Sequence, residues 1–484
     1  MTSAPASAAP AGFHTAKVIQ LATVAALGGF LFGFDTAVIN GAVGAMREDF
    51  ALSSGMTGFT VSSALLGCMV GAYLAGRLAD RIGRIRVMVI AAVLFTASAL
   101  GSGLAFGPAD MIFWRILGGI GVGAASVIAP AYIAEISPAQ IRGRMGSLQQ
   151  LAIVIGIFVA LLSDYAIAAA AGGSNEPLWF GMDAWRWMFI AEVIPAVMYG
   201  VLALTIPESP RYLIKLGQEK RARDVLAQVL SDGIEVRIRE IKRTIVQDSR
   251  STFADLKRSG GGLLPIVWIG VALSVFQQFV GINVIFYYSS TLWQAVGFTE
   301  SDALAQTVIT SVTNIVVTLV AIALIDKIGR RRLLLIGSVG MTLTLGTMAW
   351  IFARAPMVPQ LDEAGREVLE DGVRVLLPQL TDTSGPIALV AANAFVVFFG
   401  MSWGPAVWVL LGEMFNNTIR ALALGIAAAA QWLANFVIST TFPPMADVGL
   451  WFAYGFYTLA ALVSIFFVWK FIPETRGIEL EDMA

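Results

Sequence analysis

The sequence is poor in charge, cysteine and histidine. Asp, Glu, Lys and Arg make up 13% of its 484 residues, against roughly 25% in a typical soluble domain, so the chain cannot cover a water-facing surface. The single cysteine, Cys68, excludes an internal disulfide. Together with the single histidine, His14, it leaves little material for a metal site or a serine–histidine pair. The motif HExxH of metalloproteases is also missing. We therefore expect no enzyme, no metal and no cofactor.

Long apolar runs are abundant instead. Hydrophobic residues make up 57% of the chain, and a membrane-spanning helix needs about 20 mostly apolar residues. Twelve segments meet this requirement: 16–41, 57–79, 86–106, 110–133, 145–170, 185–205, 263–293, 302–325, 332–353, 386–411, 418–443 and 449–472. The polar stretch 206–262 separates six spans from six. We predict an all-α membrane protein with twelve transmembrane helices and a helical linker.

The distribution of positive charge predicts the orientation. Lys and Arg accumulate in cytoplasmic loops, and most of the 32 such residues follow even-numbered spans or lie near the two ends of the chain. The N-terminal tail does not have the pattern of a signal peptide. We expect a multi-pass protein of the cell inner (plasma) membrane with both termini in the cytoplasm. The expected parts are a tail (1–15), a six-helix bundle (16–205), a cytoplasmic helical linker (206–262), a second six-helix bundle (263–472) and a tail (473–484).

Three motifs at span ends occur once in each half, in the same order. GRLADRIGR (76–84) after span 2 is matched by DKIGR (326–330) after span 8, and IPESPR (206–211) after span 6 by IPETRG (472–477) after span 12. Spans 4 and 10 each end in a Glu, and an Ile-Arg pair begins six residues later: Glu135 with 141–142, and Glu413 with 419–420. Three repeats in register indicate a duplicated six-helix unit, and hence two pseudo-symmetric bundles.

The charged side chains of these motifs predict a cytoplasmic ion-pair network that joins both halves and holds the inner side shut. The alternative is that they are ordinary anchors at the membrane interface. The predicted members are Asp80, Arg84, Glu135, Arg142, Glu208, Asp326, Arg330, Glu413, Arg420 and Glu474.

Three charged residues lie inside the N-terminal spans. Asp35 is the only charge between Leu21 and Ala42, and an ionised side chain at membrane depth costs roughly 3 kcal/mol or more. Asp35 in span 1 and Arg115 in span 4 both lie about 8 Å below the outer ends of their helices, with Glu192 of span 6 at a similar depth. Because one Arg cannot fully compensate two carboxylates, we expect Asp35 to take up a proton with Arg115 as its counter-charge. The alternative is a static ion pair that fixes helix packing.

Amides and aromatics, without charge, mark the middle of the C-terminal spans. Gln277, Gln278 and Asn283 lie in span 7, and Gly281 between them permits a local break. Further amides are Asn314, Gln431 and Asn435. Amides both donate and accept hydrogen bonds, which suits the hydroxyl groups of a neutral polyol. The alternative for each amide, and the one preferred for Asn435, is a contact that holds packed helices together.

At these motifs the chain resembles the sugar porter family of the major facilitator superfamily, and within it the bacterial sugar–proton symporters. The matching segments are GRLADRIGR, PESPR, FQQFVGIN (276–283), MSWGP (401–405) and the PET near the end. The resemblance implies sugar contacts at Gln150, Gln277, Gln278, Asn283, Asn314, Gly404, Trp408, Gln431 and Trp432, and an aromatic gate or lining at Phe32, Tyr287 and Tyr288. Ile157 departs from the xylose symporters, which carry Gln there.

We therefore predict a proton-coupled symporter that imports a neutral monosaccharide, such as D-xylose or D-glucose, by alternating access. The alternatives are a facilitated uniporter and a symporter of another polyol such as myo-inositol. The expected partners are a small sugar, protons and the lipid bilayer, with no nucleic acid and no obligatory protein partner. We expect loop 354–385 to be a solvated linker.

Overall fold

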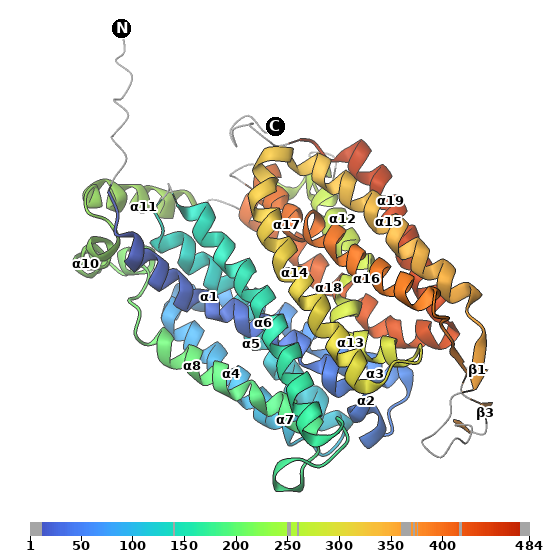
Figure 1. Ribbon diagram of the computed structural model, residues 1–484. Coiled ribbons are helices and arrows are strands. Elements are labelled where there is room, and N and C mark those ends of the chain that lie inside the picture. The colour runs from blue at the N-terminus through green and yellow to red at the C-terminus, as the bar shows by residue number, and fades with distance from the viewer. Residues whose placement is uncertain are drawn as a thin grey trace.

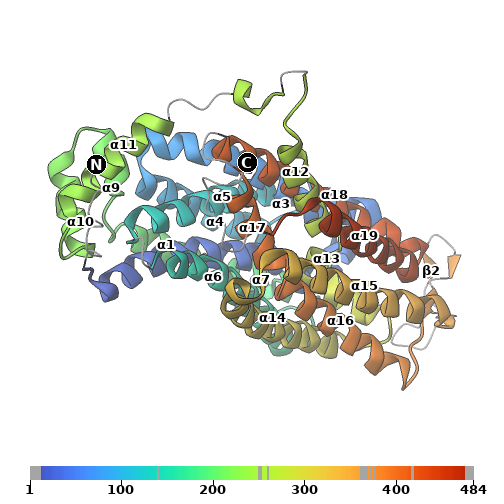
Figure 2. The same cartoon turned by 90° about the horizontal axis from the view of Figure 1, so that it is seen from above.

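The computed structural model describes residues 12–138, 141–248, 253–258, 261–359, 369–370, 373–374, 376–415 and 419–474. Twelve helical segments in this part of the chain are long and apolar enough to cross a membrane, which confirms the predicted number. They form two bundles that lie side by side (Figures 1 and 2). Short helices gather at one end of the molecule, which we call the linker end, and the opposite end is the loop end.

The N-terminal bundle contains six spans, of which the first and the sixth are broken. The elements are α1 (Thr15–Ala37) and α2 (Ile39–Asp49), α3 (Ser54–Ile82), α4 (Arg84–Gly103), α5 (Pro108–Ile136), α6 (Arg142–Ala171), η1 (Trp179–Gly181), and α7 (Ala184–Ala191) with α8 (Val193–Ala203). Glycines let these helices touch through their backbones. A Cβ at Gly119 of α5 would lie 1.9 Å from the carbonyl oxygen of Ala64 in α3, a close approach typical of membrane helices.

The polar segment between the bundles folds into short helices. These are α9 (Pro210–Lys215), α10 (Glu219–Val229), α11 (Ile234–Asp248) and the 3-10 turn η2 (Phe253–Leu256). The segment before α1 contacts these helices, since the N–H of Gly12 donates to Asp232 Oδ1 at 3.0 Å. The predicted helical linker is therefore present (Figure 1).

The C-terminal bundle also has two broken spans, its first and its fourth. Its elements are α12 (Pro265–Phe279) and α13 (Ile282–Gln294), α14 (Glu300–Ile328), α15 (Arg330–Arg354), α16 (Ser384–Gly400) and α17 (Trp403–Met414), α18 (Arg420–Val448) and α19 (Leu450–Phe471). Several spans begin two or three residues earlier than predicted, and in α3 and α14 a polar N-cap starts the helix. The side chain of Ser53 accepts from Met56 N and that of Thr299 from Asp302 N, which satisfies a free N–H of the first turn.

The loop between α15 and α16 differs from the prediction. Two short antiparallel pairs form there, β1 (Met357–Pro359) with β4 (Leu376–Pro378) and β2 (Leu369–Glu370) with β3 (Val373–Arg374). Pairing of backbone N–H and C=O groups across the loop gives the ends of this polar segment a fixed geometry at the loop end. The sequence analysis did not anticipate these strands, and the solvation of the loop stays a prediction.

Candidate functional site

A buried ion pair lies in the middle of the N-terminal bundle. Arg115 Nη1 of α5 donates to Asp35 Oδ1 of α1 at 3.1 Å, and to the Asp35 carbonyl oxygen, also at 3.1 Å. The two side chains are 2% and 1% exposed. Asp35 Oδ2 and Arg115 Nε have no hydrogen-bond partner in the described part of the chain. The pair is thus only partly satisfied, in a place where water does not reach it.

Glu192 joins this pair from the break between α7 and α8. Glu192 is 1% exposed, and neither of its carboxylate oxygens has a hydrogen-bond partner among the described residues. It lies within electrostatic range of both Asp35 and Arg115. The structure therefore brings together the three residues expected to converge. Two carboxylates against one guanidinium leave an excess negative charge if both ionise, and the low-dielectric interior disfavours that state.

Asp164 is a fourth buried ionisable residue, and the sequence analysis missed it. It lies in α6 and is 0% exposed. Its Oδ2 accepts from the N–H of Gly41 at 3.3 Å, and its Oδ1 has no partner among the residues described. The signal was present in the sequence, because Asp164 is the only charge in the apolar span 145–170, as Asp35 is between Leu21 and Ala42.

A chain of amides runs across the break in span 7. The break falls at Gly281, which has a φ of +82°, as the sequence suggested, and glycine tolerates this left-handed conformation. Asn283 Nδ2 donates to Gln278 Oε1 at 2.5 Å, and Gln278 Nε2 donates to Gln277 Oε1 at 3.4 Å. Gln277 Nε2 in turn donates to the carbonyl oxygen of Trp403 at 2.8 Å. The amide chain therefore links two discontinuous spans.

The second of these spans breaks between α16 and α17. Trp403 is fully buried, and its indole Nε1 donates to the Leu334 carbonyl oxygen and to Ser338 Oγ. One turn later, Trp408 is 43% exposed. A Cβ added at Gly404 would meet only Phe399, at ordinary contact distances from 3.6 Å. The backbone at Gly404 is therefore open enough for a small group to lie beside it.

Aromatic residues from both bundles meet at α1 and α18. The rings of Phe32 and Trp432 are 5.6 Å apart between centroids. Next to Trp432, the half-buried Gln431 has an Oε1 atom with no partner in the described chain. Asn435 is buried and accepts from Ser439 Oγ of the same helix at 3.1 Å, so the packing role between helices preferred for it stays a prediction. Gln431 is thus the amide of α18 with spare hydrogen-bonding capacity.

The remaining predicted contact residues occupy both packed and partly open positions. Tyr288 donates to the Ser439 carbonyl oxygen at 3.0 Å and packs on Phe442, so it holds α13 against α18. Tyr287 is 6% exposed. Gln150 and Asn314 are half-buried. A contact with a ligand at these positions stays a prediction.

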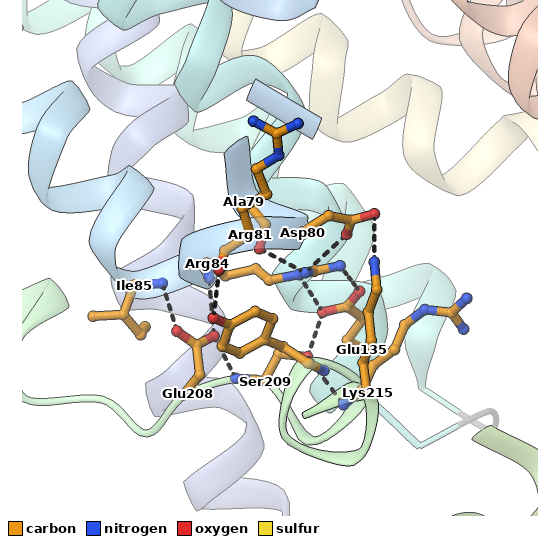
Figure 3. Close-up of polar contacts among 11 residues, drawn as sticks. Ala79, Asp80, Arg81, Arg84, Ile85, Glu135, Glu208, Ser209 and Lys215 are labelled. Atoms are coloured by element: carbon orange, nitrogen blue, oxygen red, sulfur yellow. Dashed lines mark hydrogen bonds and ion pairs between the residues drawn. The ribbon is translucent and has the colours of Figure 1, made fainter. Parts of the chain in front are cut away.

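At the linker end, Arg84 is the centre of the predicted ion-pair network (Figure 3). Its guanidinium contacts Glu135 of α5 at 2.9 Å and Asp80 of α3 at 3.2 Å. Glu208 accepts from the N–H groups of Arg84 and Ile85 at 3.0 and 3.2 Å. Glu208 therefore caps the N-terminus of α4, where the helix dipole favours a negative charge.

The second bundle repeats the Arg–Glu ion pair and the cap of the following helix by a Glu. Arg330 Nη2 contacts Glu413 Oε1 at 2.8 Å, and the N–H of Arg330 donates to Glu474 Oε1 at 3.0 Å. Gly83 and Gly329, which precede the two arginines, have φ values of +97° and +95°. These contacts each lie within one bundle. The side chains of Arg142, Asp326 and Arg420 lie outside the described part of the structure, so a network between the halves stays a prediction.

At the loop end, hydrogen bonds join the two bundles directly. Asn40 Nδ2 of α2 donates to the carbonyl oxygen of Phe286 and to Ser289 Oγ of α13, both at 2.9 Å. Ser62 Oγ of α3 and Thr440 Oγ1 of α18 are 2.6 Å apart. These contacts from different helix pairs close the loop end of the interface between the halves.

Comparison with known proteins adds a family to this geometry. The sequence profile of a family described as "Sugar (and other) transporter" matches residues 21–484. A glucose transport protein from Synechocystis sp. is 60% identical over 468 residues, which cover 96% of this chain and 97% of that protein. The D-xylose–proton symporter of Escherichia coli K12 is 37% identical over 506 residues, covering 97% of this chain and 96% of that protein.

Solved structures show the same fold. The xylose transporter of E. coli in a partially occluded inward-open conformation superposes with a TM-score of 0.79 at 36% identity, over 96% of this chain and 100% of that chain. The same transporter in its inward-open conformation gives 0.79 at 37% identity, over 96% of this chain and 99% of that chain.

Proposed function

The chain belongs to the sugar transporter family, and from that premise we propose that it is a proton-coupled symporter of a neutral monosaccharide that works by alternating access. The observation that carries the coupling is the buried group of Asp35, Arg115 and Glu192, with two carboxylates for one guanidinium. A relative of 37% identity is itself named a D-xylose–proton symporter.

The amides near the breaks of the C-terminal bundle support an uncharged substrate. Gln431 has a free acceptor, Asn283 and Trp408 are partly exposed, and Gly404 leaves space in the backbone. Amides supply both donors and acceptors for hydroxyl groups, and an indole gives a sugar ring an apolar wall with one N–H. Phe32 and Trp432 approach from opposite bundles, so movement of the bundles changes the walls around the substrate.

The coupling follows from the charge balance at Asp35. With Asp35 ionised, its pair with Arg115 holds α1 against α5. When Asp35 takes a proton, the charge pair that holds α1 against α5 is lost, and Glu192, within electrostatic range, balances the charge of Arg115. Because α1 carries Phe32 at the bundle interface, release of α1 connects the proton to the substrate-facing aromatic pair. Each inward proton then contributes about 2.3 kcal/mol per 100 mV of membrane potential.

We propose that the linker end faces the cytoplasm and that the structure is closed to the outside. The Lys- and Arg-rich segments lie at the linker end, as the positive-inside rule requires, and the loop end is closed by Asn40 and by the Ser62–Thr440 contact. Similarity to the inward-open states of the E. coli transporter supports this assignment.

A facilitated uniporter of D-glucose is the second candidate. The relative of 60% identity is named only as a glucose transport protein, with no coupling ion in its name. Ile157, where we expect a glutamine in xylose symporters, is half-buried and apolar. Both observations favour glucose over xylose as the sugar. Because the name of the 60% identical relative mentions no ion, proton coupling has to be tested by experiment. Another polyol, such as myo-inositol, is the third candidate.

The test is uptake of radiolabelled D-glucose and D-xylose by proteoliposomes, with and without an inward proton gradient. Symport predicts accumulation above the external concentration that a protonophore collapses. Equilibration without overshoot would instead establish a uniporter. Failure to take up either sugar, while myo-inositol enters, would replace the substrate and leave the fold assignment intact.

A further inference from the structure

Asp164 is a buried carboxylate that the proposed coupling does not use. It is 0% exposed in α6, about two turns (about 10 Å) before the loop end of that helix. Its contacts are few, because Oδ2 accepts one backbone N–H at 3.3 Å and Oδ1 has no partner in the part of the chain described. A carboxylate in this position is poorly compensated as an anion.

The N–H that Asp164 accepts belongs to the segment that closes the loop end. Gly41 lies in the first turn of α2, directly after the break at Val38, and a Cβ at Gly41 would lie 2.6 Å from Asp164 Cβ. The Gly41 carbonyl oxygen accepts from Ser174 Oγ at 3.2 Å. The N–H of Ser174 donates to Glu300 Oε1 of α14 at 2.9 Å. A continuous path therefore leads from Asp164 through Gly41 and Ser174 to the other bundle.

The preceding residue, Asn40, extends this path to α13. Besides its two donated bonds, its Oδ1 accepts from the N–H of Ser290 at 3.1 Å, and its carbonyl oxygen accepts from Ser290 Oγ at 2.5 Å. The start of α2 is thus attached to α13 and, through Ser174, to α14. We call the contacts of Asn40, Gly41, Ser174, Ser290 and Glu300 the loop-end gate. Asp164 contacts this gate from the side of the N-terminal bundle.

Charged groups on the surrounding helices do not complete the shell of Asp164. The helices packed against α6 are α1, α2, α5, α7 and α14. Their charged residues in the half of the molecule toward the loop end are Asp35, Arg47, Glu48, Asp49, Asp110, Arg115, Arg186, Glu192 at the end of α7, Glu300 and Asp302. Asp35 pairs with Arg115 and Asp49 with Arg186. None of these groups reaches Asp164 Oδ1, which has no hydrogen-bond partner among the described residues.

We propose that Asp164 is a second proton-binding residue, which is protonated while the loop-end gate is closed and releases its proton when the gate opens. In the closed state a charge on Asp164 would be buried with a single weak hydrogen bond, so the neutral form is favoured. Separation of α2 from α13 and α14 admits water to Asp164, and the carboxylate ionises there.

The direction of the pH effect follows from linkage. The closed gate binds one more proton than the open gate, so acid outside the membrane favours closure and alkali favours opening, by at most about tenfold per pH unit for one proton. Asp164 meets water only from the loop end, and its proton returns to the side from which it came. It therefore biases the gate without adding to the number of protons transported with each sugar.

This inference rests on the proposed alternating access, and its test measures the gate without measuring uptake. Two spin labels are placed on exposed residues near the loop end, one in each bundle, through Phe113→Cys in α5 and Val448→Cys in α18. The background carries Cys68→Ser, which removes the native thiol, and Asp35→Asn, which removes the titration of the proposed coupling residue. Pulsed electron paramagnetic resonance measures the distance between the two labels. The fraction of molecules with the longer distance, which is the open gate, is then recorded as a function of pH.

We expect this population to rise with pH in the background protein and to become independent of pH when Asp164→Asn is added. Asp110→Asn is the matched control, because Asp110 is a carboxylate near the loop end that contacts only its own segment through Trp114 and Phe106, and it is expected to keep the full pH response. Asp164→Ser serves as a second neutral variant if Asp164→Asn is not monodisperse.

Two results would overturn the inference. One is a pH response that persists with both neutral variants of Asp164, and the other is no pH response in the background protein. Neither result bears on proton coupling at Asp35, which would fail separately if proteoliposomes with Asp35→Asn still accumulated sugar.

Discussion

Replacing Asp35 with Asn removes one charge from the buried group and leaves its shape nearly unchanged. Arg115 loses the negative charge at 3.1 Å but keeps two acceptors, the amide Oδ1 of the new Asn and the backbone carbonyl oxygen of residue 35, also at 3.1 Å. Breaking a buried ion pair on one side costs about 3–5 kcal/mol when the remaining charge is uncompensated. Glu192 lies within range of Arg115 and restores neutrality with a single negative charge. We therefore expect the Asp35→Asn variant to fold.

The loss of coupling is large on the scale of the driving force. One proton moving inward contributes about 2.3 kcal/mol at 100 mV, and one pH unit adds about 1.4 kcal/mol. The sum of about 3.7 kcal/mol corresponds to roughly 500-fold accumulation of sugar at equilibrium. Without a titrating residue at position 35, the gradient does no work on the sugar, and the expected ratio is 1.

The assay compares two modes of transport in the same proteoliposomes. Asp35→Asn is expected to abolish accumulation driven by an imposed gradient and to keep exchange of internal for external sugar, since exchange requires no net proton movement. Asp49→Asn is the matched control, because Asp49 pairs with Arg186 at the more exposed loop end, and it should accumulate sugar normally. Full accumulation by Asp35→Asn would refute the reasoning and make Asp35 and Arg115 a structural pair.

Three further substitutions test the rest of the account. Gln431→Ala should raise the KM for sugar several-fold, because it loses a hydrogen bond of about 1 kcal/mol to the substrate. Its control, Asn435→Ala, should lower the Tm and leave the KM unchanged. Equal KM values for the two variants would remove Gln431 from the binding site. Gly281→Ala should lower the Tm more than Gly297→Ala does. Both glycines have a positive φ, but only a Cβ at Gly281 meets a neighbour, at 2.7 Å from Tyr457. Equal decreases in Tm would mean that backbone strain alone matters. Arg330→Ala should destabilise the linker end by about 1–3 kcal/mol. The measurement is the Tm, which should be lower than that of the control Arg332→Ala, a substitution of an exposed neighbour. No difference in Tm would mean that the ion pair with Glu413 does not stabilise the protein.

The number of spans and their repetition could be predicted from the sequence because both follow from local chemistry. The thickness of the hydrocarbon core sets the length of an apolar run, and Gly281 in span 7 marks a break through its conformational freedom. The paired motifs around Arg84 and Arg330 led to the prediction of a network between the halves, whereas the described ion pairs of both residues lie within one bundle.

The break at Val38 could not be predicted in this way, because no glycine or proline adjoins it and packing between helices decides where it falls. The other two breaks had signals that the sequence analysis did not use, since Pro195 follows the break at Glu192, and Gly400 and Pro405 flank the break at Met401. The contacts of Asn40 with α13 join residues about 250 positions apart, and they depend on how the two bundles meet. Asp164 had a signal equal to that of Asp35, but its significance depends on Gly41 lying against it, which only the folded structure shows.

The most direct test of the account is the flow of protons caused by sugar. Proteoliposomes loaded with a pH-sensitive dye receive external D-glucose with no imposed gradient and with the membrane potential clamped at zero. The account predicts that sugar entry acidifies the interior of wild-type vesicles and leaves the interior of Asp35→Asn vesicles unchanged. Sugar uptake by the wild-type protein without acidification would contradict proton symport.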